Sequence, residues 1–272
     1  MVRISVIAHS AAYGNAAVLA EGLKSFAQVT TSFFIKDEKE MFPSKVNKTI
    51  HEADHYVVVG AISLGHLPKK YWSKGVTIIL TDSKYMNDYK RYNEIFKANS
   101  FRVFAMPDLA SLAETESIYY QPFIMPDVSL VKTELICHSP YHPDKMKQKG
   151  TAFISAICAK NNLPLEIITG KKWKETIEIK ARHLIFIDQI FRGIGKSGLE
   201  AMLLNCAVLS GEKPDCNYLP PIMWTDKKRL EDDLLSLIFD KQLTKLIVEK
   251  QRIWAKVNLD AEFVAQRIYE NR

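Results

Sequence analysis

Short apolar runs rich in β-branched residues alternate with helix-like segments along this chain, and no other feature constrains its fold as strongly. In the first half the expected strands cover residues 3–8, 29–35, 56–61, 76–81 and 101–105, with expected helices at 15–26 and 87–97. Parallel strands need a crossover connection, usually a helix, so this alternation is typical of a parallel sheet. The first half is therefore predicted to be an α/β domain.

The alternation stops at residues 120–127, where two prolines interrupt it, and this segment is the predicted linker. A second series follows, with expected strands at 134–138, 165–169, 184–187 and 207–209 and expected helices at 150–161, 173–181 and 197–204. From Lys227 the pattern is wholly helical and includes a long amphipathic run from Gln242 to Tyr269. We predict two α/β domains, at 1–127 and 128–256. A C-terminal helix at 257–272 either packs on the second domain or crosses back to the first.

Composition sets limits on the class of protein. The chain has 272 residues, of which 47% are hydrophobic and 25% charged, as in ordinary globular proteins. Its longest apolar runs are far shorter than the roughly 20 residues that cross a bilayer, and its N-terminus lacks the pattern of a secretory signal. We therefore expect no integral membrane contact and a location in the cytoplasm, which for a viral protein is the host cytoplasm.

Cysteines and charge give weaker limits. The four cysteines, Cys137, Cys158, Cys206 and Cys216, have no C-x-x-C spacing, so we expect buried thiols and no metal site. The formal net charge is +6. Residues 1–130 have 14 Lys and Arg against 13 Asp and Glu, whereas the rest of the chain has 23 against 18. A basic second half suits either an anionic small molecule or a polyanion.

The segment from Arg192 to Ser210 matches parts of three phosphate-binding motifs. Its glycines form the G-x-G-x-x-G of dinucleotide-binding folds: Gly193, Gly195 and Gly198. Lys196 and Ser197 are the residues that end a P-loop, but that motif needs a glycine at position 190, where this chain has Ile190. The third interpretation is a phosphate-binding turn followed by a helix that carries Glu200, and then by a strand.

Ligands of doubly wound sheets bind beyond the carboxyl ends of the strands, so the residues there are the first candidates for a site. In the second domain the candidates are His138, Ser139, Lys145, Lys147, Lys149, Gly150, Asp188, Gln189, Ser197, Gly198 and Glu200. The three lysines lead into a helix start and would clamp a diphosphate, although a solvated loop has the same composition. Glu200 would accept hydrogen bonds from two vicinal ribose hydroxyls, or it is an ordinary acidic residue in the first turn of a helix.

Several motifs recur in a fixed order along the second half. They are H-S-P at 138–140, K-G-T at 149–151, D-Q at 188–189, S-G-L-E-A-M-L-L-N-C-A-V at 197–208, L-P-P-I at 219–222 and R-I-W-A-K-V at 252–257. Together they resemble nucleotide-sugar glycosyltransferases with the GT-B fold, most closely the retaining family-four type. The resemblance is specific over residues 133–272 and weak over the first half.

This resemblance implies a fold and an activity. The fold is α/β, with two Rossmann-like domains of GT-B architecture, a cleft between them and C-terminal helices. The activity is transfer of a sugar from a UDP- or GDP-sugar co-substrate, with no tightly bound cofactor. Lys149 would neutralise the donor diphosphate, Ser197 and Gly198 would lie at the phosphate, and Glu200 would hold the ribose.

In the first domain the resemblance points to two loops. Gly14 lies where such enzymes place a glycine-containing loop near donor and acceptor, although an ordinary turn before a helix also explains it. Asp82 lies where they keep a polar residue near the reacting carbon, and it would orient or deprotonate the acceptor hydroxyl. A helix cap is the alternative for Asp82. His66, after another strand, is a lesser candidate.

Two departures from the family pattern leave other functions open. Arg192 stands where an acidic residue is usual, eight positions before Glu200, and Asn205-Cys206-Ala207 replaces G-x-P. A glycosyltransferase-like subunit that binds a partner without catalysis would tolerate both changes. An NAD-dependent oxidoreductase is the third hypothesis, but the acidic residue expected about 20 positions after the glycines is missing, since Glu212 comes too early.

The acceptor is the least determined part of the hypothesis. The chain has no D-x-D sequence, which favours a metal-independent enzyme. Small size and basic charge fit compact phage enzymes that glycosylate hydroxymethylated pyrimidines in DNA, where the base must be flipped out of the duplex. A glycan or a small molecule is an equally good acceptor.

Overall fold

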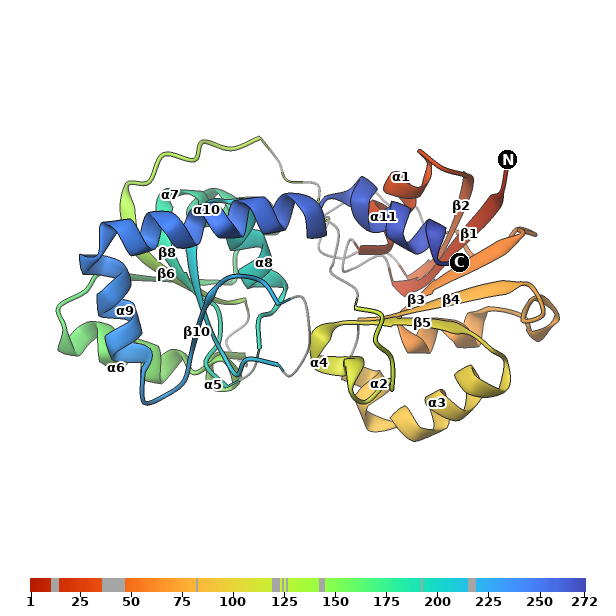
Figure 1. The fold of residues 1–272 in the computed structure, drawn as a ribbon, viewed down its shortest axis with the longest axis horizontal. Coiled ribbons are helices and arrows are strands. Elements are labelled where there is room, and N and C mark those ends of the chain that lie inside the picture. Colours follow the sequence, from red (N-terminus) through yellow and green to blue (C-terminus); the bar gives the residue numbers. More distant parts are fainter. Residues whose placement is uncertain are drawn as a thin grey trace. The chain divides into compact units, whose positions relative to one another are not determined.

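The computed structural model describes residues 1–10, 15–35, 47–81, 83–118, 123, 125, 127–141, 145–191, 193–214 and 219–272. The chain divides into two compact units (Figure 1). Unit 1 consists of Met1–Ile124 and Asn258–Arg272, and unit 2 of Met125–Val257. Each unit contains one five-stranded sheet with helices around it, so the predicted α/β class is confirmed.

The sheet of unit 1 has the strand order β2-β1-β3-β4-β5, and neighbouring strands run parallel. Its strands are β1 (Arg3–Ser10), β2 (Gln28–Ile35), β3 (His55–Val59), β4 (Gly75–Leu80) and β5 (Arg102–Ala105). All five residues of β3 are buried, as are five of the six in β4. Strands covered on both faces read as continuous apolar runs, which is why the sequence pattern revealed them.

Unit 1 contains the following helices: α1 (Asn15–Leu23), η1 (Ala61–His66), η2 (Lys69–Tyr71), α2 (Ser83–Asn87), α3 (Tyr89–Ala98), α4 (Pro107–Ala110) and α11 (Ala261–Glu270). The last of these, α11, packs on α1 although almost the whole chain separates them. Gly22 of α1 permits this contact, because a Cβ atom there would lie 2.3 Å from the carbonyl oxygen of Ala261. Val264, Ala265 and Ile268 of α11 belong to the buried core of unit 1.

The sheet of unit 2 has the order β10-β9-β8-β6-β7 and is also parallel. Its strands are β6 (Glu134–Tyr141), β7 (Leu165–Thr169), β8 (His183–Ile187), β9 (Ala207–Gly211) and β10 (Met223–Thr225). Its helices are α5 (Met146–Lys149), α6 (Thr151–Lys160), α7 (Trp173–Arg182), α8 (Lys196–Leu203), α9 (Leu230–Phe239) and α10 (Lys241–Asn258). The sequence pattern missed β10, which has only three residues.

The helical run expected from Gln242 to Tyr269 is wrong as a single run, since the chain leaves the helix at Leu259 and Asp260. Asp260 then caps α11, and its Oδ1 accepts hydrogen bonds from the N–H groups of Glu262 and Phe263 at 3.0 and 3.2 Å. An aspartate in this position satisfies amides that a helix start leaves without a partner.

Three of the predicted buried thiols are confirmed: Cys137, Cys158 and Cys206 are free and buried. Cys216 lies outside the described residues, as does most of the predicted linker at 120–127. No helix in the described part of the chain combines the length and apolar character needed to cross a bilayer.

Candidate functional site

Unit 2 has a topological switch point between β6 and β8. The chain goes from β6 to β7 on one side of the sheet and returns to β8 on the other side. Ligands of such sheets bind at the carboxyl ends of the two strands that flank this point. Here His138 and Ser139 lie near the end of β6, and Asp188 directly follows β8.

One buried carboxylate organises the switch point. Asp188 is fully buried, and its Oδ1 accepts a hydrogen bond from Lys149 Nζ at 2.9 Å. Its Oδ2 accepts from the N–H of Gly195, the N-cap of α8, at 2.6 Å. Lys149 also donates to the Ser139 carbonyl at 3.2 Å, and 16% of its side chain is exposed. Asp188 therefore connects the ammonium group of a partly exposed lysine side chain to the N-terminus of a helix.

The glycines of the G-x-G-x-x-G sequence contact the protein itself closely. A Cβ atom on Gly198 would lie 2.9 Å from Asp188 Oδ2 and 2.7 Å from Ile194 Cγ1. A Cβ atom on Gly195 would lie 3.4 Å from the same oxygen, and one on Gly193 would lie 3.1 Å from Pro214. Gly198 is therefore required for the approach of α8 to Asp188.

Glu200 is buried in an ion pair. Its Oε2 accepts from Lys180 Nζ at 2.7 Å, and its Oε1 accepts from Trp173 Nε1 at 3.0 Å. Lys180 has no exposed surface and also donates to the hydroxyl and the carbonyl of Ser197, at 2.7 and 3.2 Å. Burial opposes ionisation of Glu200, but the charges of Lys180 and Lys196 and these hydrogen bonds outweigh it and lower its pKa.

His138 lies in the interior with both ring nitrogens hydrogen-bonded. Nδ1 lies 2.7 Å from the Ile187 carbonyl, which can only accept, so Nδ1 donates and Nε2 accepts from the Thr151 hydroxyl at 2.8 Å. Burial lowers the pKa of His138 to about 4, and the nearby charge of Lys149 acts in the same direction. The ring thus connects β6 to the carboxyl end of β8 and to the start of α6.

The remaining predicted residues of unit 2 differ in their surroundings. Lys145 and Lys147 are exposed, so of the three lysines only Lys149 turns toward Asp188. Gly150 has a φ of +78° between α5 and α6, and a Cβ atom there would lie 2.6 Å from Ile190. Gln189 Nε2 donates to the Gly193 carbonyl. Gly150 and Gln189 therefore shape the loops around the network.

Unit 1 has an equivalent switch point between β1 and β3. His9 of β1 lies there against His66 of η1, with His9 Nδ1 2.7 Å from His66 Nε2. The ring of Phe34 stacks on His66 with centroids 3.9 Å apart, and the His9 N–H donates to Ser63 Oγ at 2.7 Å. Burial lowers the pKa of His66, as does the charge of His9. Gly14 and Asp82, predicted for this side, lie outside the described residues, as does Arg192 of unit 2.

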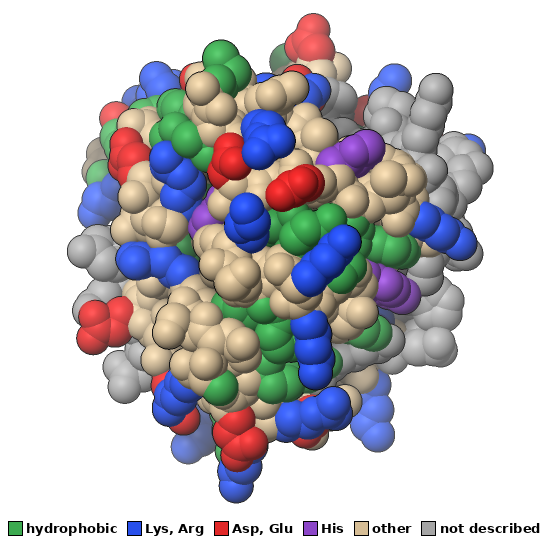
Figure 2. Space-filling model, turned by 90° about the vertical axis from the view of Figure 1, so that its right-hand side faces the viewer, with side chains coloured by type: hydrophobic (Ala, Val, Ile, Leu, Met, Phe, Trp, Pro, Cys, Tyr) green, Lys and Arg blue, Asp and Glu red, His purple; other side chains and the backbone are tan. Residues whose placement is uncertain are grey.

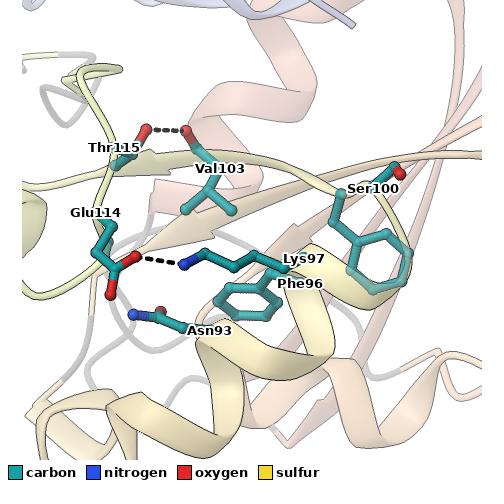
Figure 3. A pocket seen from close by; sticks show the side chains of 9 residues that line it. Asn93, Phe96, Lys97, Ser100, Val103, Glu114 and Thr115 are labelled. Atoms are coloured by element: carbon teal, nitrogen blue, oxygen red, sulfur yellow. Dashed lines mark hydrogen bonds and ion pairs between the residues drawn. The ribbon is translucent and has the colours of Figure 1, made fainter.

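A separate small pocket of about 200 Å³ lies in unit 1 near the start of β5 (Figure 3). Lys97 and Glu114 form an ion pair of 2.5 Å across it. Asn93, at its edge, is buried and donates to the Leu112 carbonyl at 2.7 Å. These polar groups all have partners within unit 1, and the pocket lies at the amino end of the strand, away from the edge where ligands of such sheets bind.

Sequence reasoning missed Lys180 and Trp173 as members of the Glu200 cluster. Lysines on a helix are usually solvated, so the expected helix at 173–181 does not by itself predict a buried Lys180. A signal was present, since Lys180 shares its helix face with Ile177 and Ala181, which are both buried. A lysine on an apolar face needs a buried acidic partner.

No family model and no curated protein sequence matches the chain. Solved structures match it over its full length. HepE from Anabaena, in complex with UDP and glucose, has a TM-score of 0.71 at 13% identity, covering 100% of this chain and 99% of that one. Sucrose-phosphate synthase from Thermosynechococcus elongatus has a TM-score of 0.62 at 10% identity, covering 100% and 98%. The glycosyltransferase SnogD from Streptomyces nogalater has a TM-score of 0.52 at 9% identity, covering 99% of each chain. The predicted fold, two Rossmann-like domains of the GT-B type, is confirmed.

Proposed function

We propose that this protein is a glycosyltransferase whose unit 2 binds a nucleotide-sugar donor. The observation that carries this proposal is the Asp188 network, in which one buried carboxylate connects Lys149 to the N-terminus of α8 at the switch point. The solved structure of HepE, which shares the fold, contains UDP. A cation and a helix start side by side are suited to the diphosphate of such a nucleotide.

Lys149 is the residue we assign to the donor diphosphate. An ammonium group has three N–H donors, and the bonds to Ser139 and Asp188 use two of them. The third is assigned to a phosphate oxygen, and the first turn of α8 adds the Ser197 amide and the positive end of the helix dipole, whereas the Gly198 amide donates to the Gly195 carbonyl at 3.0 Å. As the glycosidic bond to the phosphate breaks, these groups stabilise the negative charge that develops on the leaving nucleotide.

Glu200 is proposed to hold the nucleotide ribose. Its two oxygens each accept one hydrogen bond within the protein, and a carboxylate has about four acceptor positions. Two vicinal hydroxyls are therefore a match for the remaining acceptor capacity. Lys180 and Trp173 fix the orientation of the carboxylate before the nucleotide arrives.

The remaining details of the reaction are proposals from the sequence. They are transfer with retention at the sugar carbon, independence from metal ions, and orientation of the acceptor hydroxyl by Asp82. The acceptor is proposed to be a hydroxymethylated base in DNA or a glycan. Among the described residues on the face drawn in Figure 2, Asp and Glu side chains lie between the Lys and Arg side chains.

Replacement of Lys149 by Ala tests the donor site. We expect turnover of the sugar nucleotide to fall by about 100-fold or more, because one charge-stabilising group is lost from the transition state. Lys174→Ala is the matched control, since Lys174 is an exposed lysine of α7, and it should leave turnover unchanged. Undiminished turnover in Lys149→Ala would contradict the assignment.

Thermal-shift measurements separate the proposed function from its alternatives. Stabilisation by UDP or GDP supports the donor site, whereas stabilisation by NADH alone supports an oxidoreductase. A catalytically impaired subunit would bind the nucleotide but release none from a panel of sugar donors. Transfer of labelled sugar to hydroxymethylated DNA, compared with a set of oligosaccharides, identifies the acceptor class.

A further inference from the structure

Helix α10 of unit 2 carries a row of exposed apolar side chains. Leu246, Ile253 and Val257 are 47%, 60% and 53% exposed, although side chains of this kind are normally buried in a monomer. Their spacing of seven and then four residues places them on one face of the helix. They therefore form a stripe along α10, the long blue helix of unit 2 in Figure 1.

The opposite face of α10 holds the helix in place. Thr244, Gln251 and Ala255 are buried there, and the Gln251 side-chain amide lies 2.7 Å from the Cys206 carbonyl and 3.2 Å from the Val208 N–H. The apolar stripe consequently faces away from the core of unit 2.

A row of cations runs beside the stripe. Lys245, Arg252 and Lys256 each immediately precede one of the three apolar residues, so they repeat the same spacing one position earlier, and all three are exposed. Lys250 is exposed as well and lies one turn after Leu246. Glu249 is the one acidic residue of the helix.

We propose that α10 docks on an anionic lipid surface, with its axis parallel to the membrane plane. An interfacial helix buries an apolar stripe at the boundary between headgroups and acyl chains, while flanking Lys and Arg bind anionic headgroups. In this arrangement the apolar stripe is buried and the row of cations binds the headgroups. The inference does not rest on the proposed glycosyltransferase activity, because it concerns a different surface of unit 2.

Charge and polarity favour this partner over two others. A second copy of α10 against the stripe would bring two rows of like charges together, which is unfavourable. A nucleic acid would neutralise the cations but would leave the three apolar side chains against phosphates and water. An anionic bilayer would both bury the apolar side chains and neutralise the cations.

Vesicle co-sedimentation of the full chain tests the proposal. Two sets of vesicles are compared, phosphatidylcholine alone and phosphatidylcholine mixed with phosphatidylglycerol. We expect binding to the anionic vesicles, weaker binding at high salt, and little binding to the neutral ones. Leu246→Ser with Ile253→Ser, and separately Lys245→Glu with Lys256→Glu, should each lower the partition coefficient roughly 10-fold or more.

Lys171→Glu with Lys174→Glu is the control, because it makes the same charge change at two exposed lysines of unit 2 that are not part of α10. All variants alter exposed side chains and should keep the wild-type melting temperature and response to UDP. Absence of binding to anionic vesicles would overturn the proposal, as would an equal loss in the control. So would a concentration-dependent dimer, or DNA binding, that the Leu246 and Ile253 changes abolish. A missing response to UDP in the wild-type protein would count against the donor site and not against the membrane surface.

Discussion

At the scale of single residues, buried charges determine which substitutions the site can tolerate. Lys180 and Glu200 are both almost free of solvent contact, and their 2.7 Å ion pair is satisfied by further bonds to Ser197 and Trp173. Removing one member of such a pair leaves a charge in a place with no water to solvate it. The pair therefore stabilises the fold only while it is complete.

Lys180→Met is predicted to lower the free energy of unfolding by about 3–5 kcal/mol, because Glu200 then lacks its cation. Adding Glu200→Gln removes the isolated charge and should recover part of this loss in a double-mutant cycle measured by urea denaturation. Lys160→Met is the matched control, since Lys160 pairs with Glu231 at 2.9 Å but is 68% exposed, and it should cost at most about 1 kcal/mol. Equal losses for the two lysines would contradict the account.

His138 predicts how stability depends on pH. Its pKa is about 4 in the folded protein, against 6.5 for an ordinary histidine, so between these values the unfolded chain binds more protons. Its contribution is complete above pH 6.5 and is lost as the pH falls toward 4, by roughly 3 kcal/mol in total. The free energy of unfolding, measured by urea denaturation at several pH values in this range, should change less steeply with pH for His138→Gln than for wild type. Replacement of the exposed His51 by Gln should leave the pH dependence of the free energy of unfolding as in wild type. A wild-type pH dependence in His138→Gln would refute the argument.

At the scale of elements, the sequence predicted the strands and helices that are marked by a pattern of residues close together in the chain. Strands such as β3 and β4 are buried on both faces, so continuous apolar runs marked them, and the expected helix at 173–181 corresponds to Trp173–Arg182. The three residues of β10 are too few for any period. The break between α10 and α11 was missed because apolar periodicity continues across it, and the signal, Asp260 as a helix cap, is a single residue.

In the candidate site, too, the sequence predicted the features that depend on element order and missed contacts between separate elements. Placement of Asp188, Lys149 and Ser139 near the strand ends followed from element order. Pairing of Lys149 with Asp188, and not of Lys145 or Lys147, depends on which lysine of a short helix faces the sheet. The Lys180–Glu200 pair joins α7 to α8, and no local pattern specifies such a contact between separate helices.

At the scale of the whole molecule, unit 1 is assembled from two distant segments of the chain. Its core includes side chains of α11, and Gly22 of α1 permits close approach of the α11 backbone. Unit 2 is continuous in sequence. Loss of α11 should therefore weaken unit 1 and leave the core of unit 2 intact.

Ile268→Ala tests this dependence, because Ile268 is 1% exposed and belongs to the core of unit 1. We expect it to destabilise unit 1 by about 2–5 kcal/mol, the usual cost of removing a buried isoleucine side chain. Phe263→Ala on the same helix, where the ring is 51% exposed, should cost much less. Hydrogen exchange would locate the effect: amides of α1 and β1 should lose protection, while those of β8 and β9 keep theirs. Equal loss of protection in both sheets would mean that the two units unfold as one, and that α11 stabilises the chain as a whole.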